Sequence, residues 1–169
     1  MNSSDTAQPD KGDQDDYLID SIHFSMASRN DLLKIQKILS VNGLPEKDVG
    51  EHNDLFMLAW DNGTLVATFG AELLENDGLL RSLSVHLNYR NRGIASELCN
   101  RIEAYARNAG VKRLYLLTTT AKNYFVDRGY SVCSRESVPQ TVQGTAEFSF
   151  LCPCTAVCMV RALCDGAKS

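Results

Sequence analysis

Two neighbouring stretches of the chain carry the clearest periodicity. Apolar and polar residues alternate over 80–85, which predicts a strand, and Ile94, Leu98 and Ile102 recur at helical spacing before Gly110, which predicts a helix. A β-rich run at 111–117 follows this helix. We therefore expect a strand, a turn, a helix and a second strand in this order.

The segments before this unit predict further strands and one helix. Residues 21–26 can form a strand, after which Asn30 or Asp31 caps a helix that ends at Gly43. Strands at 55–60 and 64–73 flank Asp61-Asn62-Gly63, because Asn-Gly supplies the positive φ angles of a tight hairpin turn. The sequence Asn76-Asp77-Gly78 predicts a second turn of the same kind before the next strand.

The remaining segments are less periodic. Residues 45–52 are expected to be a short helical or looped segment, and 121–125 lead into Arg128-Gly129-Tyr130. Closing strands are predicted at 130–138 and 155–163, with an irregular stretch over 139–153. Strands should therefore outnumber helices.

The turn between the strand and the helix has the composition of an anion cradle. The first turn of a helix carries unpaired N–H groups that favour a phosphate, and Gly93 leaves room for close approach. Arg90 and Arg92 add full positive charges, and Ser96 adds a hydroxyl. The expected ligand is a pyrophosphate. The alternative is an exposed basic turn before an ordinary helix.

Composition limits the class of protein. The chain has 169 residues, of which 44% are hydrophobic, and this suits one domain over residues 21–165. Residues 1–20 are rich in Asp and predict a disordered acidic tail. No window predicts a signal peptide or a membrane span, so we expect a cytoplasmic protein. The net charge of −4 argues against nucleic acid as a partner.

These motifs resemble the GCN5-related N-acetyltransferases (GNAT). The family signature, Arg/Gln-x-x-Gly-x-Gly/Ala after a strand that ends in Leu-x-Val, is matched by Leu83-Ser84-Val85 and by 90–95. The later order, a strand followed by 121–130, is also the order of the family. The resemblance implies an α/β (α+β) fold with a mixed, mostly antiparallel, splayed sheet of six to seven strands and about four flanking helices.

The resemblance also implies acetyl-CoA as a cosubstrate. Its pantetheine arm would lie between two splayed strands and pair with the backbone of Leu83 and Val85, where an N–H group would polarise the acetyl carbonyl. The thiolate of coenzyme A is already a fair leaving group, so positioning should supply most of the catalysis. The residues expected to bind the cofactor are Leu83, Ser84, Val85, Arg90, Asn91, Arg92, Gly93, Ile94, Ala95, Ser96, Tyr124 and Phe125.

Attack by an amine requires a general base and a proton for the departing thiolate. Glu72 is the first candidate for the base and Glu147 the second, and for each the alternative is an exposed carboxylate. The family usually protonates the thiolate with a tyrosine, but alignment of the motif puts Phe125 at that position and Thr118 at an asparagine. Solvent could protonate the thiolate instead. A protein that binds acetyl-CoA as a sensor without turnover is therefore an alternative.

A narrower resemblance concerns the acceptor. Residues 78–83, 116–121, 145–148 and 151–153 look like the small acetyltransferases found with bacterial arsenic-resistance functions, similar to amino-acid N-acetyltransferases. This implies acetylation of a small amino acid or a toxic analogue, including one bearing arsenic, and a homodimer through the last strands is common in the family. Arg81, Ser82, Thr119 and Thr120 would line the acceptor pocket together with Glu147.

Two of these assignments have structural alternatives. Arg81 could clamp an acidic group of the substrate in a fork, or it could form a salt bridge to Glu72. The threonines 118–120 could simply reflect strand propensity.

The six cysteines raise a different class of function. Cys152-Pro153-Cys154, with Cys158 nearby, could bind a soft metal or trivalent arsenic through thiolates. The spacing is not that of a zinc knuckle, and strand alternation would instead bury Cys154 and Cys158 as apolar residues. The three histidines form no ligand motif, and we expect no resident metal.

Overall fold

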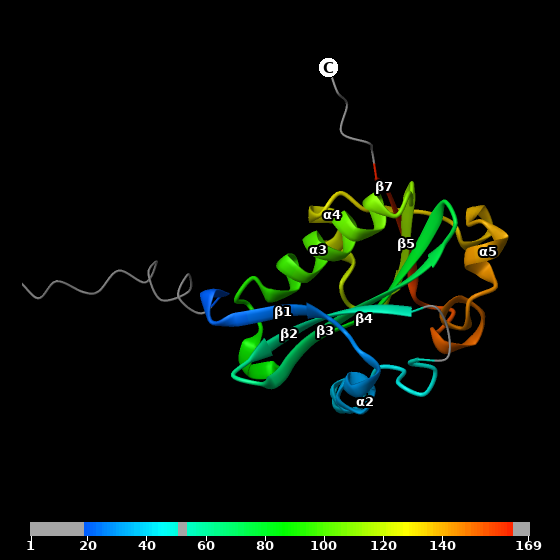
Figure 1. Cartoon of the computed structure of the whole chain (residues 1–169). Helices are drawn as coiled ribbons and strands as arrows, with labels where there is room; N and C mark the ends of the chain where they lie inside the picture. The colour runs from blue at the N-terminus through cyan, green and yellow to red at the C-terminus, as the bar shows by residue number, and fades with distance from the viewer. Residues whose placement is uncertain (1–18, 51–53, 164–169) are drawn as a thin grey trace, which may run out of the picture.

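The computed structural model describes residues 19–50 and 54–163, and in this part of the chain seven strands form one sheet (Figure 1). The strand order is β1-β2-β3-β4-β5-β7-β6, in which only β4 and β5 run parallel. The predicted mixed, mostly antiparallel sheet is therefore confirmed. The predicted acidic tail falls almost entirely on residues outside the described ones. The strands are β1 (Ile22–Met26), β2 (Asp54–Asp61), β3 (Thr64–Leu74), β4 (Asp77–Val85), β5 (Arg113–Thr118), β6 (Ser131–Val132) and β7 (Val157–Ala162).

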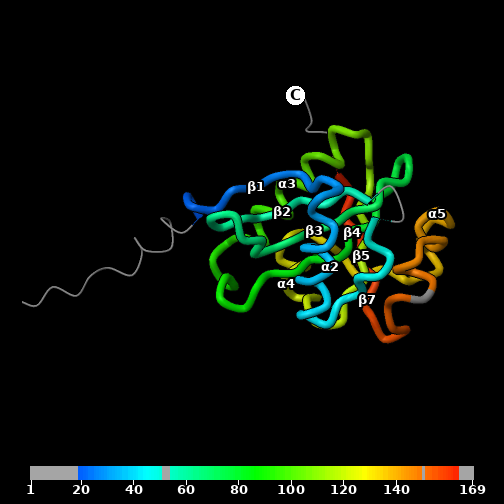
Figure 2. The backbone as a smooth tube through the Cα atoms, turned by 60° about the horizontal axis from the view of Figure 1, so that its bottom comes forward, coloured from blue at the N-terminus to red at the C-terminus, as the bar shows by residue number. Residues whose placement is uncertain are grey.

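Helices cover both faces of the sheet. Figure 1 shows α3 and α4 on one face and α2 on the other, and α5 lies beside the end of the sheet, in contact with β4. The segment that contains α5 keeps this position in the rotated view of Figure 2, at the end of the molecule opposite the start of β1. The α-helices are α2 (Leu32–Val41), α3 (Ile94–Asn108), α4 (Lys122–Asp127) and α5 (Gln140–Gln143), and shorter turns are η1 (Arg29–Asp31), η2 (Leu87–Tyr89), η3 (Arg135–Ser137) and η4 (Glu147–Leu151).

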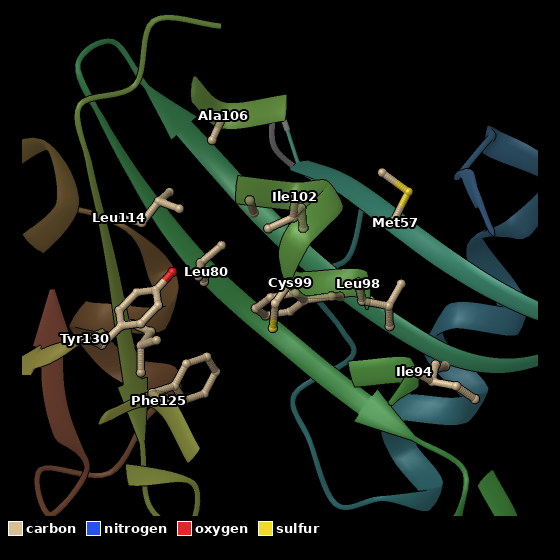
Figure 3. Packing of buried hydrophobic residues seen from close by; sticks show 14 of the residues in the cluster. Met57, Leu80, Ile94, Leu98, Cys99, Ile102, Ala106, Leu114, Phe125 and Tyr130 are labelled. Carbon is tan, nitrogen blue, oxygen red and sulfur yellow. The ribbon is translucent and has the colours of Figure 1, made fainter. Parts of the chain in front are cut away.

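Strand alternation divides the core between the two faces. Phe56 and Leu58 of β2 pack in the cluster under α2, whereas Met57 and Ala59 join the cluster under α3. Figure 3 shows the second cluster, in which the buried face of α3 lies over β4 and residues of the α4 region approach from the side. Its labelled members are Met57, Leu80, Ile94, Leu98, Cys99, Ile102, Ala106, Leu114, Phe125 and Tyr130. The same helix that packs on the sheet thus begins at the predicted glycine turn.

The turn before β4 lies earlier than predicted. β3 and β4 are joined by Glu75 and Asn76, because Leu74 already pairs with Asp77. Glu75 adopts a φ of 56°, the left-handed value that the prediction assigned to the next residues. Gly78 is instead a strand residue, and a Cβ there would lie 2.8 Å from Leu114 Cδ2. The missing side chain of Gly78 therefore permits close packing against β5, and Gly78 is not a turn residue.

The predicted strand over 130–138 is wrong for most of its length. Only Ser131 and Val132 pair with β7. The chain then turns at Ser134, whose carbonyl accepts hydrogen bonds from both the backbone N–H and the hydroxyl of Ser137. Such local hydrogen bonds compete with a strand ladder. The stretch over 139–153, predicted as irregular, contains α5 and η4.

The parallel pair β4 and β5 separates along its length. Their register runs from Asp77 opposite Arg113 to Leu80 opposite Leu116, and both strands continue beyond it without further pairing to each other. A bulge in β4, where Phe69 faces two residues, includes Ser82 with a φ of 57°. The sheet therefore splays open where β4 approaches α3.

Leu98 tests how strongly α3 depends on this packing. Its side chain is fully buried under the sheet, so Leu98→Ala should lower the free energy of unfolding by about 3 kcal/mol through lost burial and a cavity. Urea unfolding followed by circular dichroism measures this. Leu87→Ala is the matched control, because Leu87 is 71% exposed and its truncation should change stability by less than about 0.5 kcal/mol. Equal losses would contradict the assignment of α3 to the core.

Candidate functional site

A continuous groove occupies the opening between β4 and β5. It consists of two adjoining cavities of about 590 and about 510 Å³, which share Leu44, Leu83, Thr120 and Ala121 in their walls. The larger cavity extends along β4 to Glu147, and the smaller one extends to the start of α3. One elongated ligand could therefore reach from the helix start to the carboxylate.

The smaller cavity ends at the predicted anion cradle. Asn91 and Gly93 have φ angles of 60° and 79°, and Gly93 is the N-cap of α3. The carbonyl of Gly93 accepts the hydrogen bond from the Glu97 N–H at 3.0 Å, so the N–H groups of Ile94, Ala95 and Ser96 precede this helical bond. These groups and the positive end of the helix dipole favour an anion at this position.

The two arginines of the turn have different surroundings. Arg90 donates through Nε to the carbonyl of Val85 at 3.1 Å and through Nη2 to Oδ1 of Asn42 at 3.0 Å. Asn42 also donates to Oγ of Ser84 at 2.7 Å, so it connects the end of α2 to β4. The guanidinium of Arg92 lies 5.2 Å from the centre of the Tyr89 ring. Asn42 belongs to no recognisable sequence motif, so the sequence did not predict its contacts with Arg90 and Ser84.

The backbone of β4 directs polar groups into the groove. The N–H of His86 donates to Val66 of β3 at 2.8 Å, so alternation along a strand directs the N–H group of Val85 away from β3. Thr68 Oγ1 donates to the carbonyl of Ser82 at 2.9 Å and holds the bulge, which interrupts the alternation before Leu83. The backbone donor of Val85 is thereby available on the side from which β5 has departed.

Tyr124 and Phe125 form part of the walls of the two cavities. The Tyr124 hydroxyl lies 3.2 Å from Oγ of Ser96 in the smaller cavity, and burial raises its pKa above the ordinary value. Phe125 is buried in the wall of the larger cavity, with its ring 5.4 Å from that of Tyr130 in an edge-on arrangement. Phe125, which stands where the resemblance implies a tyrosine, is thus an apolar part of the wall, and the phenol of Tyr124 lies in the smaller cavity.

Arg81 lies in a buried cluster of carboxylates. Its guanidinium makes two hydrogen bonds to Asp48, the Nη2 to Oδ1 distance being 2.8 Å, and its side chain has no exposed surface. Glu147 and Glu72 lie 3.5 and 3.6 Å from it, and Asp54 lies at 3.8 Å. The partner closest to Arg81 is therefore Asp48 rather than Glu72. A substrate carboxylate at Arg81 would compete with Asp48.

The two base candidates differ in their access to the groove. Glu147 is buried but contributes to the wall of the larger cavity, where its Oε1 accepts a hydrogen bond from the Cys152 thiol at 3.2 Å. Burial raises the pKa of Glu147 above the ordinary value, while Arg81 and the Cys152 thiol oppose this shift. Glu72 is equally buried on β3, and it is absent from the described residues that line the groove. Glu147 is thus the better placed of the two.

The other predicted acceptor residues lie in the larger cavity. Ser82, Thr119 and Thr120 all contribute to its wall, and both threonines are exposed. Thr118 has a structural role, because its Oγ1 accepts a hydrogen bond from the Ala121 N–H at 2.9 Å. The predicted acceptor residues are therefore brought together, and their substrate contacts stay a prediction.

The cysteines are arranged differently from the predicted metalloid site. The Cys152 thiol contacts Glu147 and Cys154 is exposed, whereas Sγ of Cys133 and Sγ of Cys158 lie 3.4 Å apart. Cys154 is thus not buried as strand alternation predicted, because it precedes β7. Within residues 19–50 and 54–163, no group of three His, Cys, Asp or Glu side chains could hold a metal ion. None of the helices described is long and apolar enough to cross a membrane.

Removal of both arginines of the turn tests the cradle. Arg90→Ala with Arg92→Ala should weaken binding of acetyl-CoA at least tenfold, because two charges near the phosphates are lost. Isothermal titration at fixed ionic strength measures the dissociation constant. Arg29→Ala with Lys37→Ala removes the same charge from exposed positions and should change binding less than twofold. An unchanged constant in the first variant would remove these arginines from the site.

Arg81→Met tests the buried cluster. It leaves carboxylates buried without their guanidinium, so the free energy of unfolding should fall by about 3 kcal/mol or more in urea. The control is Arg101→Met, which breaks the Arg101–Glu97 pair with side chains 44% and 34% exposed. That loss should be below about 0.5 kcal/mol. A similar, small loss in both variants would show that the cluster does not stabilise the fold.

Proteins of known name resemble part of this sequence. The amino-acid acetyltransferase of Azotobacter vinelandii is 33% identical over 96 residues, which are 56% of this chain and 21% of that protein. The amino-acid acetyltransferase of Ectopseudomonas mendocina is 44% identical over 62 residues, 37% of this chain and 14% of that protein. The chain thus spans about a fifth or less of the length of these relatives.

Solved structures share the fold. N-acetylglutamate synthase from Neisseria gonorrhoeae, complexed with coenzyme A and N-acetyl-glutamate, matches 84% of this chain and 35% of its own with a TM-score of 0.71 and 20% identity. A Mycobacterium tuberculosis protein in complex with CoA and NLQ matches 83% of this chain and 98% of its own, with a TM-score of 0.70 and 18% identity. A model of the acetyltransferase (GNAT) family matches residues 26–130, more than half of the sequence. The chain belongs to the acetyltransferase (GNAT) family.

Proposed function

We propose that this chain transfers an acetyl group from acetyl-CoA to the amine of a small amino acid or amino-acid analogue. The observation that carries the proposal is the continuous groove, which joins the start of α3 to a buried carboxylate, Glu147. Family membership supports the reaction type, and the relatives named amino-acid acetyltransferase support the acceptor class. An arsenic-bearing amino-acid analogue falls within this class of acceptor.

The cofactor would extend along the groove. Its pyrophosphate would bind the N–H groups of residues 94–96, with Arg90 in the cavity wall and Arg92 on the same turn. The pantetheine arm would then pair with the backbone of Leu83 and Val85, on the part of β4 that no longer pairs with β5. This arrangement delivers the thioester to the larger cavity, where the acceptor would enter.

The chemistry then needs a base and an oxyanion site. Glu147 takes a proton from the acceptor, and the neutral nitrogen attacks the carbonyl carbon of the thioester. The negative charge on the carbonyl oxygen is stabilised by a backbone N–H of β4, a contribution of about 3 kcal/mol. The C–S bond breaks and the thiolate takes a proton from solvent, because Phe125 offers none. Glu147 is preferred to Glu72 because it reaches the cavity.

The acceptor would be held at the end of the larger cavity. Thr119 and Thr120 offer hydroxyl groups there, and Ser82 lies on the opposite strand. For an acidic acceptor, we propose that its carboxylate or equivalent group exchanges with Asp48 on the guanidinium of Arg81. A cavity of about 590 Å³ that also receives the acetyl arm favours small acceptors.

One observation favours a second candidate function. Phe125 stands where the family usually supplies the acid, which would suit a protein that binds acetyl-CoA as a sensor without turnover. The buried carboxylate in the cavity wall argues for turnover, because a sensor has no need of a base.

Glu147→Gln tests the assignment of the base. The variant should lower kcat about a hundredfold, because the buried carboxylate assigned as the base can no longer accept the proton. Since burial raises the pKa of Glu147, wild-type activity should fall as the pH decreases through a value above that of an ordinary glutamate. That limb of the pH profile should vanish in the variant. Release of coenzyme A, followed with a thiol reagent, gives both measurements.

Two controls separate catalysis from folding. Glu72→Gln removes the neighbouring carboxylate on β3 and should lower kcat by less than tenfold. A raised pKa means that ionised Glu147 is disfavoured in the folded state, so its neutral replacement should not lower stability at pH 7. A Glu147→Gln protein that keeps wild-type kcat would exclude Glu147 as the base, and a larger loss in Glu72→Gln would transfer the role to Glu72.

A further inference from the structure

The turn that carries Glu147 has an unusual geometry. η4 is a π-helical turn, in which the backbone N–H of Cys152 donates to the carbonyl of Glu147, five residues earlier, at 3.1 Å. The thiol of the same cysteine donates to Oε1 of the Glu147 side chain at 3.2 Å. Cys152 is therefore bonded to Glu147 twice, once through the backbone and once through the side chain.

The sequence explains why the thiol is held there. A π turn places residue i+5 beneath residue i, a position that an α-helix would give to residue i+4. Pro153 follows directly, and a residue before proline is restricted to extended backbone. Cys152 accordingly has φ −91° and ψ 140°, which ends the turn at this residue. The thiol direction is thus set by Pro153 and by the π turn together.

The two oxygens of Glu147 have different partners. Oε1 accepts a hydrogen bond from the Cys152 thiol. Oε2 lies 3.5 Å from Nη2 of Arg81 and makes no hydrogen bond with the described residues. Asp48 and Asp54 are the other charged groups that influence the carboxylate, and both lie around Arg81. The Cys152 thiol is half-buried in the wall of the larger cavity, next to Glu147. The thiol thereby holds the carboxylate at Oε1, and Oε2 is buried beside the guanidinium of Arg81.

We propose that Cys152 is a positioning residue for this acetyl transfer, whose thiol holds the Glu147 carboxylate in the orientation that accepts the proton of the acceptor amine. The inference rests on the proposed function, because it assigns a role to Cys152 only if Glu147 is the base. It also replaces the sequence-based suggestion that Cys152 is a metalloid ligand. The hydrogen bond favours the ionised carboxylate, and burial, together with Glu147, raises the pKa of Cys152 to about 12. The thiol therefore stays a donor at neutral pH.

Cys152→Ala, compared with Cys152→Ser, tests this role. The alanine variant should lower kcat/KM roughly tenfold at pH 7 and shift the acidic limb of the pH profile to higher pH, since the bond that favours ionised Glu147 is lost. The serine variant keeps a donor and should recover most of the activity and the wild-type limb. Cys154→Ala, at an exposed thiol two residues away, should match the wild type. A purely structural role of Cys152 would not move the pH profile.

A reciprocal measurement does not depend on the folding of a Cys152 variant. Because Glu147 raises the pKa of the Cys152 thiol, Glu147→Gln should make Cys152 react faster with iodoacetamide at a fixed pH. Peptide mass spectrometry reads alkylation at Cys152 and uses exposed Cys154 as the internal reference. An unchanged Cys152 rate in this variant would show that the contact is not energetically significant.

The outcomes separate the inference from the proposed function. If Glu147→Gln abolishes turnover while Cys152→Ala keeps the wild-type pH profile, the base stands and the positioning role is overturned. Equal losses in the alanine and serine variants would also overturn it, because the hydroxyl would then fail as a donor. If Glu147→Gln itself keeps full activity, the proposed base fails, and the role of Cys152 fails with it.

Discussion

The loss of pairing between β4 and β5 beyond Leu80 and Leu116 is the constraint on which the site depends. Backbone groups that leave a ladder must find other partners. Here the Val85 carbonyl accepts from Arg90, and alternation along the strand directs the Val85 N–H to the same edge, toward the groove. The splay thus leaves a backbone donor on this edge for a ligand. Because α3 starts directly beyond this edge, the donors continue into the anion cradle.

A second interaction fixes the other end of the groove. Arg81 brings together carboxylates from the segment before β2, from β2, from β3 and from the π turn. Buried ion pairs add little net stability relative to apolar packing, but removal of the arginine costs much, because the carboxylates stay buried without it. The cluster therefore serves to hold separate segments in register. One of these segments carries Glu147, so the same guanidinium that orders the fold also lies beside the proposed base.

Local sequence signals predicted the parts of the protein that depend on neighbouring residues. The glycine turn, α3 and the Asn62-Gly63 hairpin each follow from a few adjacent side chains, and the structure has them where expected. The bond between Asp48 and Arg81 joins residues 33 positions apart, and no local pattern could indicate it. The Cys152 contact is local, but it requires a π turn, which the 3.6-residue period does not predict. The order of the two base candidates changed because access to the groove depends on how the last segment folds back.

The most direct test of the account is acceptor-dependent release of coenzyme A. The protein is incubated with acetyl-CoA and, one at a time, with amino acids, phosphinate and arsenic analogues of amino acids, and polyamines, each matched to a control without protein. Mass spectrometry then identifies the acetylated product. The account predicts turnover with small amino acids or their analogues and an acetyl group on the amine. Tight binding of acetyl-CoA without turnover of any acceptor would contradict it and would favour the sensor.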